Sequence, residues 1–552
     1  MRTWRIWFLL VLVSAVVSGC SIPAPPCDLS GIVYPSGKVL AGGPLRLGVI
    51  DASPVFPFQL PGPLAQTQAD FAVLDDVRWG LIEPQPPQNG FHTYQWDDEI
   101  VALDTRVQAY QSAGFQLVMV LRAWNTWARA VAPQGGLAAA AASTPPKPEF
   151  LADYSAWVAA VVERYDADGV DDFAGLQDVD GDGRPDPVRY YQIETEAVSG
   201  VWWQGTTPAQ ATTEYLALLR AAAAAARGAY PEVKILLAGI PALDMLDGFP
   251  TAAGLQDVVT NIDPAVCGAI TAYGQLLAAT DAYDIAAVHS LADYTGLQVL
   301  ADWVRTLAGR DVPVWLTGAT SAPALLGDPP TLRVNPLYPT SGQTLWNKLQ
   351  NAFDPDHARV ESWYRQEQAR LAFKKWVYAA WLGFDALTLA FEQDRFNYQD
   401  SRLGLRDLAF QGLLDDADGF SPPAVRPVVR ALALAQGQLR GFSSVQKIQP
   451  LAGENVEAFL FRVEGLPVYV LWYDDHTAQG PDDPPVSTQV QLRVRAPELV
   501  AMTVPTRRDQ TGPDIQVVTP VDGVLTLNLT ETPVILRGEW TALYLPQVRN
   551  SH

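Results

Sequence analysis

The sequence predicts an α/β fold, a (β/α)8 TIM barrel, followed by a small all-β sandwich domain. Three observations lead to this prediction. From Leu45 onward, short apolar runs rich in β-branched residues alternate with longer helical patterns, which is typical of βαβ units around a parallel sheet. Eight such runs precede residue 440, the number that closes a barrel of this type. After that point the helical patterns stop and strand-like alternation takes over.

The eight predicted barrel strands are short, apolar and separated by stretches long enough for a helix. In chain order they are Leu45–Ile50, Ala72–Trp79, Gln116–Leu121, Arg189–Ile193, Lys234–Ala238, Ile285–Val288, Val312–Leu316 and Leu387–Ala390. Clear helical patterns between them cover Thr213–Gly228, Val299–Leu307 and Glu361–Leu382. The first of these contains an alanine run of high helix propensity. The pattern therefore predicts an enlarged barrel over residues 45–440.

A second domain is predicted after the helix Pro427–Leu439, with a boundary near Gly441. Strand-like runs recur there about every ten residues, as in a compact antiparallel β domain. The predicted strands are Ala458–Val463, Pro467–Tyr473, Thr488–Val494, Val524–Leu529 and Pro533–Leu536. Residues 441–552 are therefore expected to form an antiparallel β-sandwich.

Residues 1–19 are predicted to be an export signal peptide. Arg2 and Arg5 precede the apolar run 6–17, which is shorter than the ~20 residues that a membrane-spanning helix needs. The small residues before Cys20 resemble the bacterial lipobox, in which the cysteine is acylated after cleavage. This resemblance implies an exported protein, anchored in the lipid bilayer through Cys20 at the outer face of a bacterial membrane, on the cell surface or in the periplasm. The alternative is ordinary secretory cleavage nearby, with Cys20 incidental.

The stretch 20–44 is rich in proline and glycine and is predicted to be an extended tether. It contains Cys27, and Cys267 is the other cysteine that remains once Cys20 is acylated. An exported chain allows such a pair to form a disulfide, and the sequence leaves this open. Because a bridge would require the tether to fold back onto the barrel, we expect two separate thiols.

Charge and aromatic content narrow the class of partner. The chain has 38 basic and 60 acidic residues and a net charge of −22, so polyanions are repelled and nucleic acid is not an expected partner. It also has 17 Trp, 19 Tyr and 19 Phe. Flat aromatic faces suit the C–H faces of sugar rings, although most aromatic side chains fill protein cores. A neutral partner such as a carbohydrate fits this composition.

Candidate functional residues follow the predicted strands, because a (β/α)8 barrel carries its functional groups at the carboxyl ends of its strands. The segments at the ends of the second, fourth, sixth and seventh strands are Val77-Arg78-Trp79-Gly80, Ile193-Glu194-Thr195-Glu196, Val288-His289-Ser290 and Trp315-Leu316-Thr317-Gly318. The fourth strand is also followed by Trp202-Trp203-Gln204-Gly205-Thr206 and by Glu214-Tyr215.

These segments resemble those of retaining (β/α)8 glycoside hydrolases, in the clan that includes cellulases, β-xylosidases and β-galactosidases, over most of residues 45–440. In that clan a fourth-strand Asn-Glu carries the general acid/base, which implies this role for Glu196, with Thr195 replacing the asparagine. The resemblance also implies that Arg78, Thr195 and His289 contact substrate, although a lone histidine is as often a structural group. Candidate stacking platforms for sugar rings, with core packing as the alternative, are Trp202, Trp203 and Trp315.

The sequence departs from this clan at Gly318, where the nucleophilic glutamate is expected. A retaining glycosidase needs two carboxyl groups about 5–5.5 Å apart, and glycine has no side chain. Either another carboxylate takes the role, or the reaction inverts by activating water across a wider gap, or the barrel binds glycans without cleaving them. The substitutes, in order of preference, are Glu392, Asp394 and Asp51. Glu194 is either a further carboxylate beside Glu196 or a salt-bridge partner of a basic residue such as Arg78.

A run of alternating aspartates precedes the fourth predicted strand and is typical of a site for a hard cation such as Ca2+. Its candidate ligands are Asp178, Asp180, Asp182 and Asp186, with Asp166, Asp168, Asp171 and Asp172 nearby. Position 12 of the run is Arg189, where an EF-hand has glutamate, so the run more closely resembles the short calcium loops of extracellular proteins. We expect a structural Ca2+ here or, alternatively, a solvated acidic loop. No cofactor is expected to be required.

The leading functional hypothesis is a glycoside hydrolase that acts on β-linked oligo- or polysaccharide, with Glu196 as general acid/base and a second carboxylate still to be identified. The alternative is a catalytically inactive, glycan-binding cell-surface lipoprotein, which the glycine at position 318 favours. A scaffold without a ligand is a third class, and nothing in the sequence favours it.

Overall fold

The computed structural model describes residues 44–538 with the exception of the stretches 53–57, 98–101, 133–141, 199–202, 205–207, 242–263, 292, 309–311, 328–340, 390, 402–404 and 417–420. The predicted signal peptide and the predicted tether up to residue 43, with Cys20 and Cys27, lie outside the described residues, as does Trp202. Within the described part of the chain, no helix is both long enough and apolar enough to cross a membrane.

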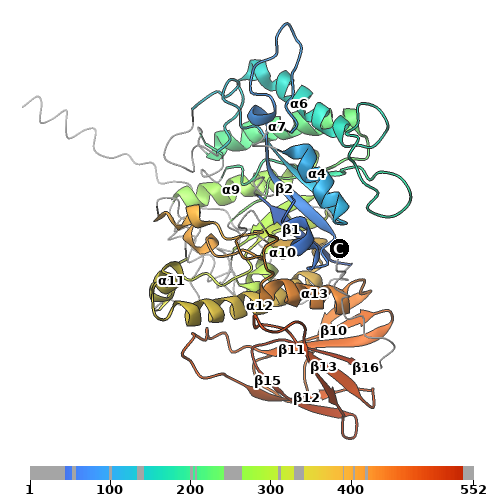
Figure 1. Ribbon diagram of the computed structural model, residues 1–552, viewed down its shortest axis with the longest axis vertical. Coiled ribbons are helices and arrows are strands. Elements are labelled where there is room, and N and C mark those ends of the chain that lie inside the picture. The colour runs from blue at the N-terminus through green and yellow to red at the C-terminus, as the bar shows by residue number, and fades with distance from the viewer. Residues whose placement is uncertain are drawn as a thin grey trace, which may run out of the picture.

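Eight parallel strands form the barrel (Figure 1), and with the antiparallel domain described below they confirm the predicted fold class. They are β1 (Arg46–Asp51), β2 (Phe71–Arg78), β3 (Gln116–Arg122), β4 (Tyr190–Ile193), β5 (Lys234–Leu236), β6 (Ala286–Ser290), β7 (Val314–Ala319) and β8 (Ala386–Leu389). Their hydrogen-bonded order is β5-β4-β3-β2-β1-β8-β7-β6. The two edges of this sheet meet through the isolated parallel bridges Leu236–Ile285 and Ile240–Val288.

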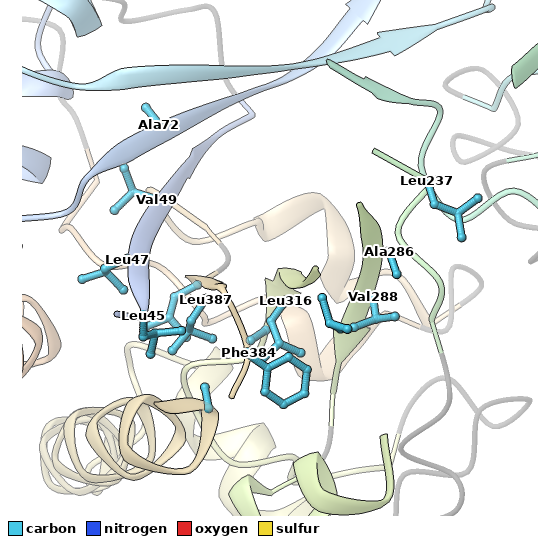
Figure 2. Close-up of a cluster of buried hydrophobic side chains, with 14 of the residues drawn as sticks. Leu45, Leu47, Val49, Ala72, Leu237, Ala286, Val288, Leu316, Phe384 and Leu387 are labelled. Atoms are coloured by element: carbon cyan, nitrogen blue, oxygen red, sulfur yellow. The ribbon is translucent and has the colours of Figure 1, made fainter. Parts of the chain in front are cut away.

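Side chains of the barrel strands alternate between two apolar layers, because successive residues of a strand point to opposite faces. Leu47 and Val49 of β1 belong to the large cluster between the strands and the helices (Figure 2). Phe71 and Val73 of β2 point into the barrel, where Trp315 also lies. Both faces of the sheet are therefore covered, which explains why the predicted strands are almost continuously apolar.

The described helices are α2 (Pro61–Ala65), α3 (Trp79–Ile82), α4 (Leu103–Ser112), α6 (Leu151–Arg164), α7 (Pro208–Ala229), α9 (Pro264–Ala278), α10 (Leu297–Ala308), α11 (Gly342–Gln350), α12 (His357–Trp381) and α13 (Pro427–Leu439). The three predicted barrel helices correspond to α7, α10 and α12, and each begins a few residues earlier than predicted. Both α7 and α13 begin at a proline, whose fixed φ and missing N–H suit the first turn of a helix.

The C-terminal domain has a six-stranded antiparallel sheet, with the order β14-β13-β16-β11-β10-β9, and a two-stranded sheet of β12 and β15. Its strands are β9 (Ser444–Lys447), β10 (Val456–Val463), β11 (Leu466–Tyr473), β12 (Thr488–Arg493), β13 (Leu499–Thr503), β14 (Asp514–Val518), β15 (Val524–Leu529) and β16 (Val534–Gly538). Buried side chains of both sheets form a single cluster, as in a β-sandwich.

The barrel and the β domain share one hydrophobic core. In Figure 1, α12 and α13 lie between the barrel and the β domain. The Trp376 ring on α12 lies 6.3 Å from the ring of Phe442 and 6.2 Å from that of Phe461. Nearby, the Tyr378 ring lies 5.4 Å from that of Phe459. Aromatic contacts of this kind bury large apolar areas, so the two domains are packed as one body.

Candidate active site

A cavity of about 270 Å3 lies at the carboxyl ends of the barrel strands. This is the end of the fold at which (β/α)8 barrels carry their functional groups. The predicted positions that line the cavity are Arg78, Thr195, Glu196, His289 and Gly318. Charged or aromatic lining residues that the sequence analysis did not single out are Asp75, Asp76, Arg122, Phe391, Arg395 and Tyr398. The cavity therefore brings together side chains from strands that are far apart in the sequence.

The Glu196 carboxyl and the His289 imidazole form a pair inside this cavity. His289 Nδ1 lies 2.9 Å from Glu196 Oε1. The Glu196 side chain is 15% exposed and that of His289 13% exposed, so the pair is shielded but reachable. Glu196 has a φ of 44°, and its N–H donates to the carbonyl of Gly239 at 3.2 Å. This left-handed backbone turns the chain after β4, so that the carboxyl faces the end of β6.

Two glycines, Gly239 after β5 and Gly318 in β7, make room for the His289 ring, and we call them the glycine slot. A Cβ atom on Gly239 would lie 2.0 Å from Nε2 of His289, and one on Gly318 would lie 2.9 Å from Cδ2. Contacts this short force the ring or a strand to move. A glutamate at position 318 is therefore incompatible with the imidazole in its present place.

Glu194 is a buried structural carboxylate. Its side chain is fully buried, and Arg122 Nε donates to its Oε2 at 2.8 Å. Burial raises the pKa of Glu194 above its usual value, although the charge of Arg122 acts in the opposite direction. The sequence left Glu194 either as a further carboxylate beside Glu196 or as a salt-bridge partner. The structure shows a salt bridge, and the partner is Arg122 instead of Arg78. Arg78 donates instead to Asp76, with Nε 2.7 Å from Oδ1.

Two adjacent carboxylates, Asp75 and Asp76, reach the cavity from β2. The register between β2 and β3 shifts at this point, and Asp76 has a φ of 69°, so the usual alternation of side chains is interrupted. Burial and the charge of Asp76 raise the pKa of Asp75. Burial acts the same way on Asp76, but Arg78 and Arg122 lower its pKa below the usual value. The signal in the sequence was a pair of acidic residues that interrupts the apolar run of β2.

The three predicted substitutes for the missing nucleophile are ion-paired and do not line the cavity. Glu392 is fully buried, and Arg395 Nη2 donates to both of its oxygens, at 2.7 and 2.9 Å. Asp394 and Asp51 are likewise buried and paired with buried arginines. The arginines that pair with these carboxylates lie on loops and helices. A prediction from the order of the strands does not give their positions.

The candidate stacking tryptophans that the structure describes are packed in the interior. Trp203 is 2% exposed, and its ring lies 6.1 Å from that of Tyr215. Trp315 is 3% exposed inside the barrel, where its ring lies 5.3 Å from Phe71 and 4.9 Å from Tyr190. Neither ring is among the residues that line the cavity.

The aspartate-rich loop lies before β4, at the end of the barrel opposite the cavity. Carboxylate oxygens of Asp178, Asp180 and Asp186 lie within 4.8 Å of one another, and Asp182 is not part of this group. Oxygens of Asp178 accept hydrogen bonds from the N–H groups of Gly181 and Gly183, at 2.7 and 2.9 Å. The loop thus gathers three of the four predicted ligands.

No protein-family model and no curated protein matches this chain. Its fold is similar to that of a family 39 glycoside hydrolase from Bacteroides cellulosilyticus WH2, with a TM-score of 0.51 and 14% identity over 92% of this chain and 83% of that one. A family 39 β-xylosidase from Caulobacter crescentus has a TM-score of 0.51 and 12% identity, over 91% and 98% of the two chains. A family 51 α-L-arabinofuranosidase from Bifidobacterium longum has a TM-score of 0.50 and 10% identity, over 92% and 98%.

The class defined by these similarities is a glycoside hydrolase-like fold, a (β/α)8 barrel followed by a β-sandwich. At identities of 10–14%, these similarities establish the fold alone, because one fold can host many activities.

Proposed function

We propose that this protein takes a β-linked oligo- or polysaccharide into the cavity and hydrolyses it, with Glu196 as general acid/base. The observation that carries the proposal is the Glu196–His289 pair, at 2.9 Å and partly exposed in the cavity at the carboxyl ends of the strands. The imidazole holds Oε1, which leaves Oε2 to meet a glycosidic oxygen. A positioned carboxyl group of this kind typically contributes about 10²–10⁴-fold to the rate of proton transfer.

The second carboxylate in this proposal is Asp75. It lines the same cavity as Glu196, whereas Glu392 is buried against Arg395. Its raised pKa makes it a stronger proton acceptor once ionised, which suits the activation of water. Asp76 is the weaker candidate because Arg78 holds its carboxylate. With Asp75 as the base that activates water, the proposed reaction is an inverting one, in which no side chain at position 318 is needed.

A catalytically inactive, glycan-binding lipoprotein is the second candidate function. The glycine slot favours it, since the His289 ring lies where a side chain at position 318 would begin. In that case Arg78, Thr195 and Glu196 act as hydrogen-bonding partners for sugar hydroxyls. The lipid anchor at Cys20 and the location at the cell surface or in the periplasm belong to this proposal as well.

The two functions are separated by assaying the purified protein against nitrophenyl β-glycosides and β-linked polysaccharides. Turnover is expected to fall at least about 100-fold in Glu196→Gln and in Asp75→Asn. Asp281→Asn is the matched control, because Asp281 is an exposed carboxylate paired with Arg220 on the outside of the barrel. Equal turnover in the wild type and Glu196→Gln removes Glu196 from the mechanism. Retention of the protein on a glycan gel without turnover supports the binding function, and the absence of both binding and turnover refutes both.

A further inference from the structure

A second group of aspartates lies at the start of the connection between α6 and β4. Carboxylate oxygens of Asp166, Asp168 and Asp172 lie within 4.8 Å of one another. This group is distinct from the run around Asp178. A cation bound at about 2.4 Å from each oxygen spans a separation of this size, since Ca2+–oxygen distances are about 2.3–2.6 Å.

The group has a large excess of negative charge. Glu163 and Asp171 add two further carboxylates to the three aspartates within ten residues of the chain. In the part of the chain that the structure describes, none of the five is ion-paired with a lysine or arginine. Arg164 is adjacent in sequence, but it pairs with Asp104, with Nη2 2.6 Å from Oδ2. Like charges gathered this closely repel one another unless a cation neutralises them.

Asp166 provides an independent sign of a ligand. Only 3% of this residue is exposed, and Oδ2 has no hydrogen-bond partner among the described residues. Its other oxygen, Oδ1, accepts a hydrogen bond from the Asp168 N–H at 3.2 Å, and Asp168 and Asp172 also accept hydrogen bonds from backbone N–H groups of the loop. A buried carboxylate oxygen without a partner is costly, because burial removes its hydration and nothing replaces it. A bound cation would take the place of the lost hydration at Oδ2 of Asp166.

We infer that Asp166, Asp168 and Asp172 bind a calcium-type cation at the start of the α6–β4 connection. The ligands are all oxygen atoms, which hard cations prefer, whereas zinc prefers nitrogen and sulfur. Ca2+ fits better than Mg2+, because it accepts the irregular geometry of a loop and fills its coordination with backbone carbonyls and water.

The cation has a structural role in this proposal. On either side of the group, the N–H of Phe173 donates to the carbonyl of Arg164, and the N–H of Val188 donates to that of Tyr165, both at 2.8 Å. The group therefore lies where the chain leaves α6 and returns toward β4. A bound cation would fix this connection without touching the cavity at the opposite end of the barrel.

The test is calorimetric titration of chelator-treated full-length protein with CaCl2, together with thermal unfolding in CaCl2 or chelator. The wild type is expected to bind Ca2+ and to gain thermal stability. Asp168→Asn changes an exposed side chain and is expected to lose one equivalent of bound Ca2+ and its share of the Tm rise. Asp166→Asn should lose the same equivalent, and Asp178→Asn should keep it. The inference is overturned if the wild type does not bind Ca2+, or if Asp166→Asn and Asp168→Asn bind as much as the wild type. It is equally overturned if Asp178→Asn with Asp186→Asn abolishes all binding.

Discussion

The glycine slot predicts that the His289 ring and a side chain at position 239 compete for the same space. Gly239→Ala places a methyl group where the His289 ring lies, and is expected to destabilise the fold by about 1–3 kcal/mol. The cost should shrink when the ring is absent, so the double variant Gly239→Ala with His289→Ala should be more stable than the sum of the single effects predicts. Urea denaturation of the four proteins measures this coupling. Additive effects would show that the ring and the glycine do not compete for space.

Glu194 is buried directly after β4, two residues before Glu196. Glu194→Gln removes the charge that Arg122 needs, and breaking a buried ion pair costs about 3–5 kcal/mol. We expect the urea midpoint to fall with little change in slope. The control is Asp281→Asn, where both partners are exposed and little change is expected. A Glu194→Gln variant as stable as this control would mean that Arg122 is satisfied by other groups.

The sequence predicted the part of the site that depends on strand order. Thr195, Glu196 and His289 follow strands whose ends meet at one face of the barrel, and they line one cavity. Asp75 was missed because alternation predicts that neighbouring strand residues face opposite sides, and a bulge in β2 breaks that rule. Trp315 illustrates the other difficulty: an aromatic side chain suits a barrel interior as well as a sugar-binding surface.

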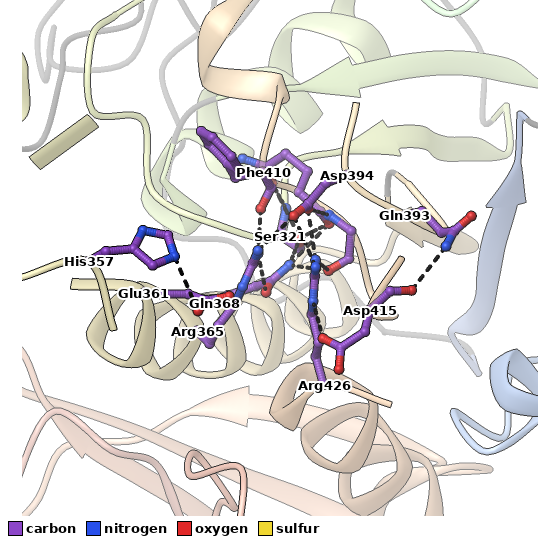
Figure 3. A network of polar contacts seen from close by, with 12 residues as sticks. Ser321, His357, Glu361, Arg365, Gln368, Gln393, Asp394, Phe410, Asp415 and Arg426 are labelled. Atoms are coloured by element: carbon purple, nitrogen blue, oxygen red, sulfur yellow. Dashed lines mark hydrogen bonds and ion pairs between the residues drawn. The ribbon is translucent and has the colours of Figure 1, made fainter. Parts of the chain in front are cut away.

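The junction of α12 and α13 is stabilised by a buried network of charges (Figure 3). Arg365 Nη2 lies 2.8 Å from Asp394 Oδ2, and Arg426 Nη1 lies 2.7 Å from Oδ1. Burial raises the pKa of Asp394, but these two arginines outweigh it and lower the pKa below its usual value. A carboxyl of this kind stabilises the fold fully above its unfolded pKa of about 3.9, and the contribution is lost as the pH falls through the folded value.

Asp394→Asn is therefore expected to cost about 3–5 kcal/mol at neutral pH, because two buried guanidinium groups lose the carboxylate that they share. Between about pH 5 and pH 2 the wild type should lose more stability than this variant, which has no carboxyl to protonate. Denaturation with guanidinium chloride at several pH values measures the free energy of unfolding of both proteins. Parallel stability curves for the two proteins would contradict the assignment.

The eight barrel strands were predictable from the sequence, whereas β9, β13 and β14 of the β domain were not. All eight barrel strands lie within a few residues of their predicted positions, because both of their faces are apolar. β14 was missed because four of its five residues are exposed, so burial imposes no hydrophobic alternation on it. β9 has four residues, of which only Val445 is buried. β13 is buried along almost its whole length and therefore shows no alternation either.

The shared core between barrel and β domain predicts that the two unfold together. Removing one would expose Trp376, Tyr378, Phe459 and Phe461 to water, at a cost that neither domain offsets alone. Calorimetry should show a single transition with equal calorimetric and van't Hoff enthalpies. Trp376→Ala, a loss of about 3–5 kcal/mol, should lower that transition as a whole. Two separate melting steps would show that the domains are energetically independent.

The closure of the barrel has a consequence for any molecule in the cavity. The edges after β5 and at β6 meet through isolated bridges, and Glu196 and His289 flank this seam, with the His289 N–H donating to the carbonyl of Ile240 at 2.9 Å. A sugar that binds both side chains would link the two edges of the barrel where they meet. A bound glycan should then slow the local opening of this seam, whether or not the glycan is cleaved. The measurement is slower amide hydrogen exchange at Ile240 and His289.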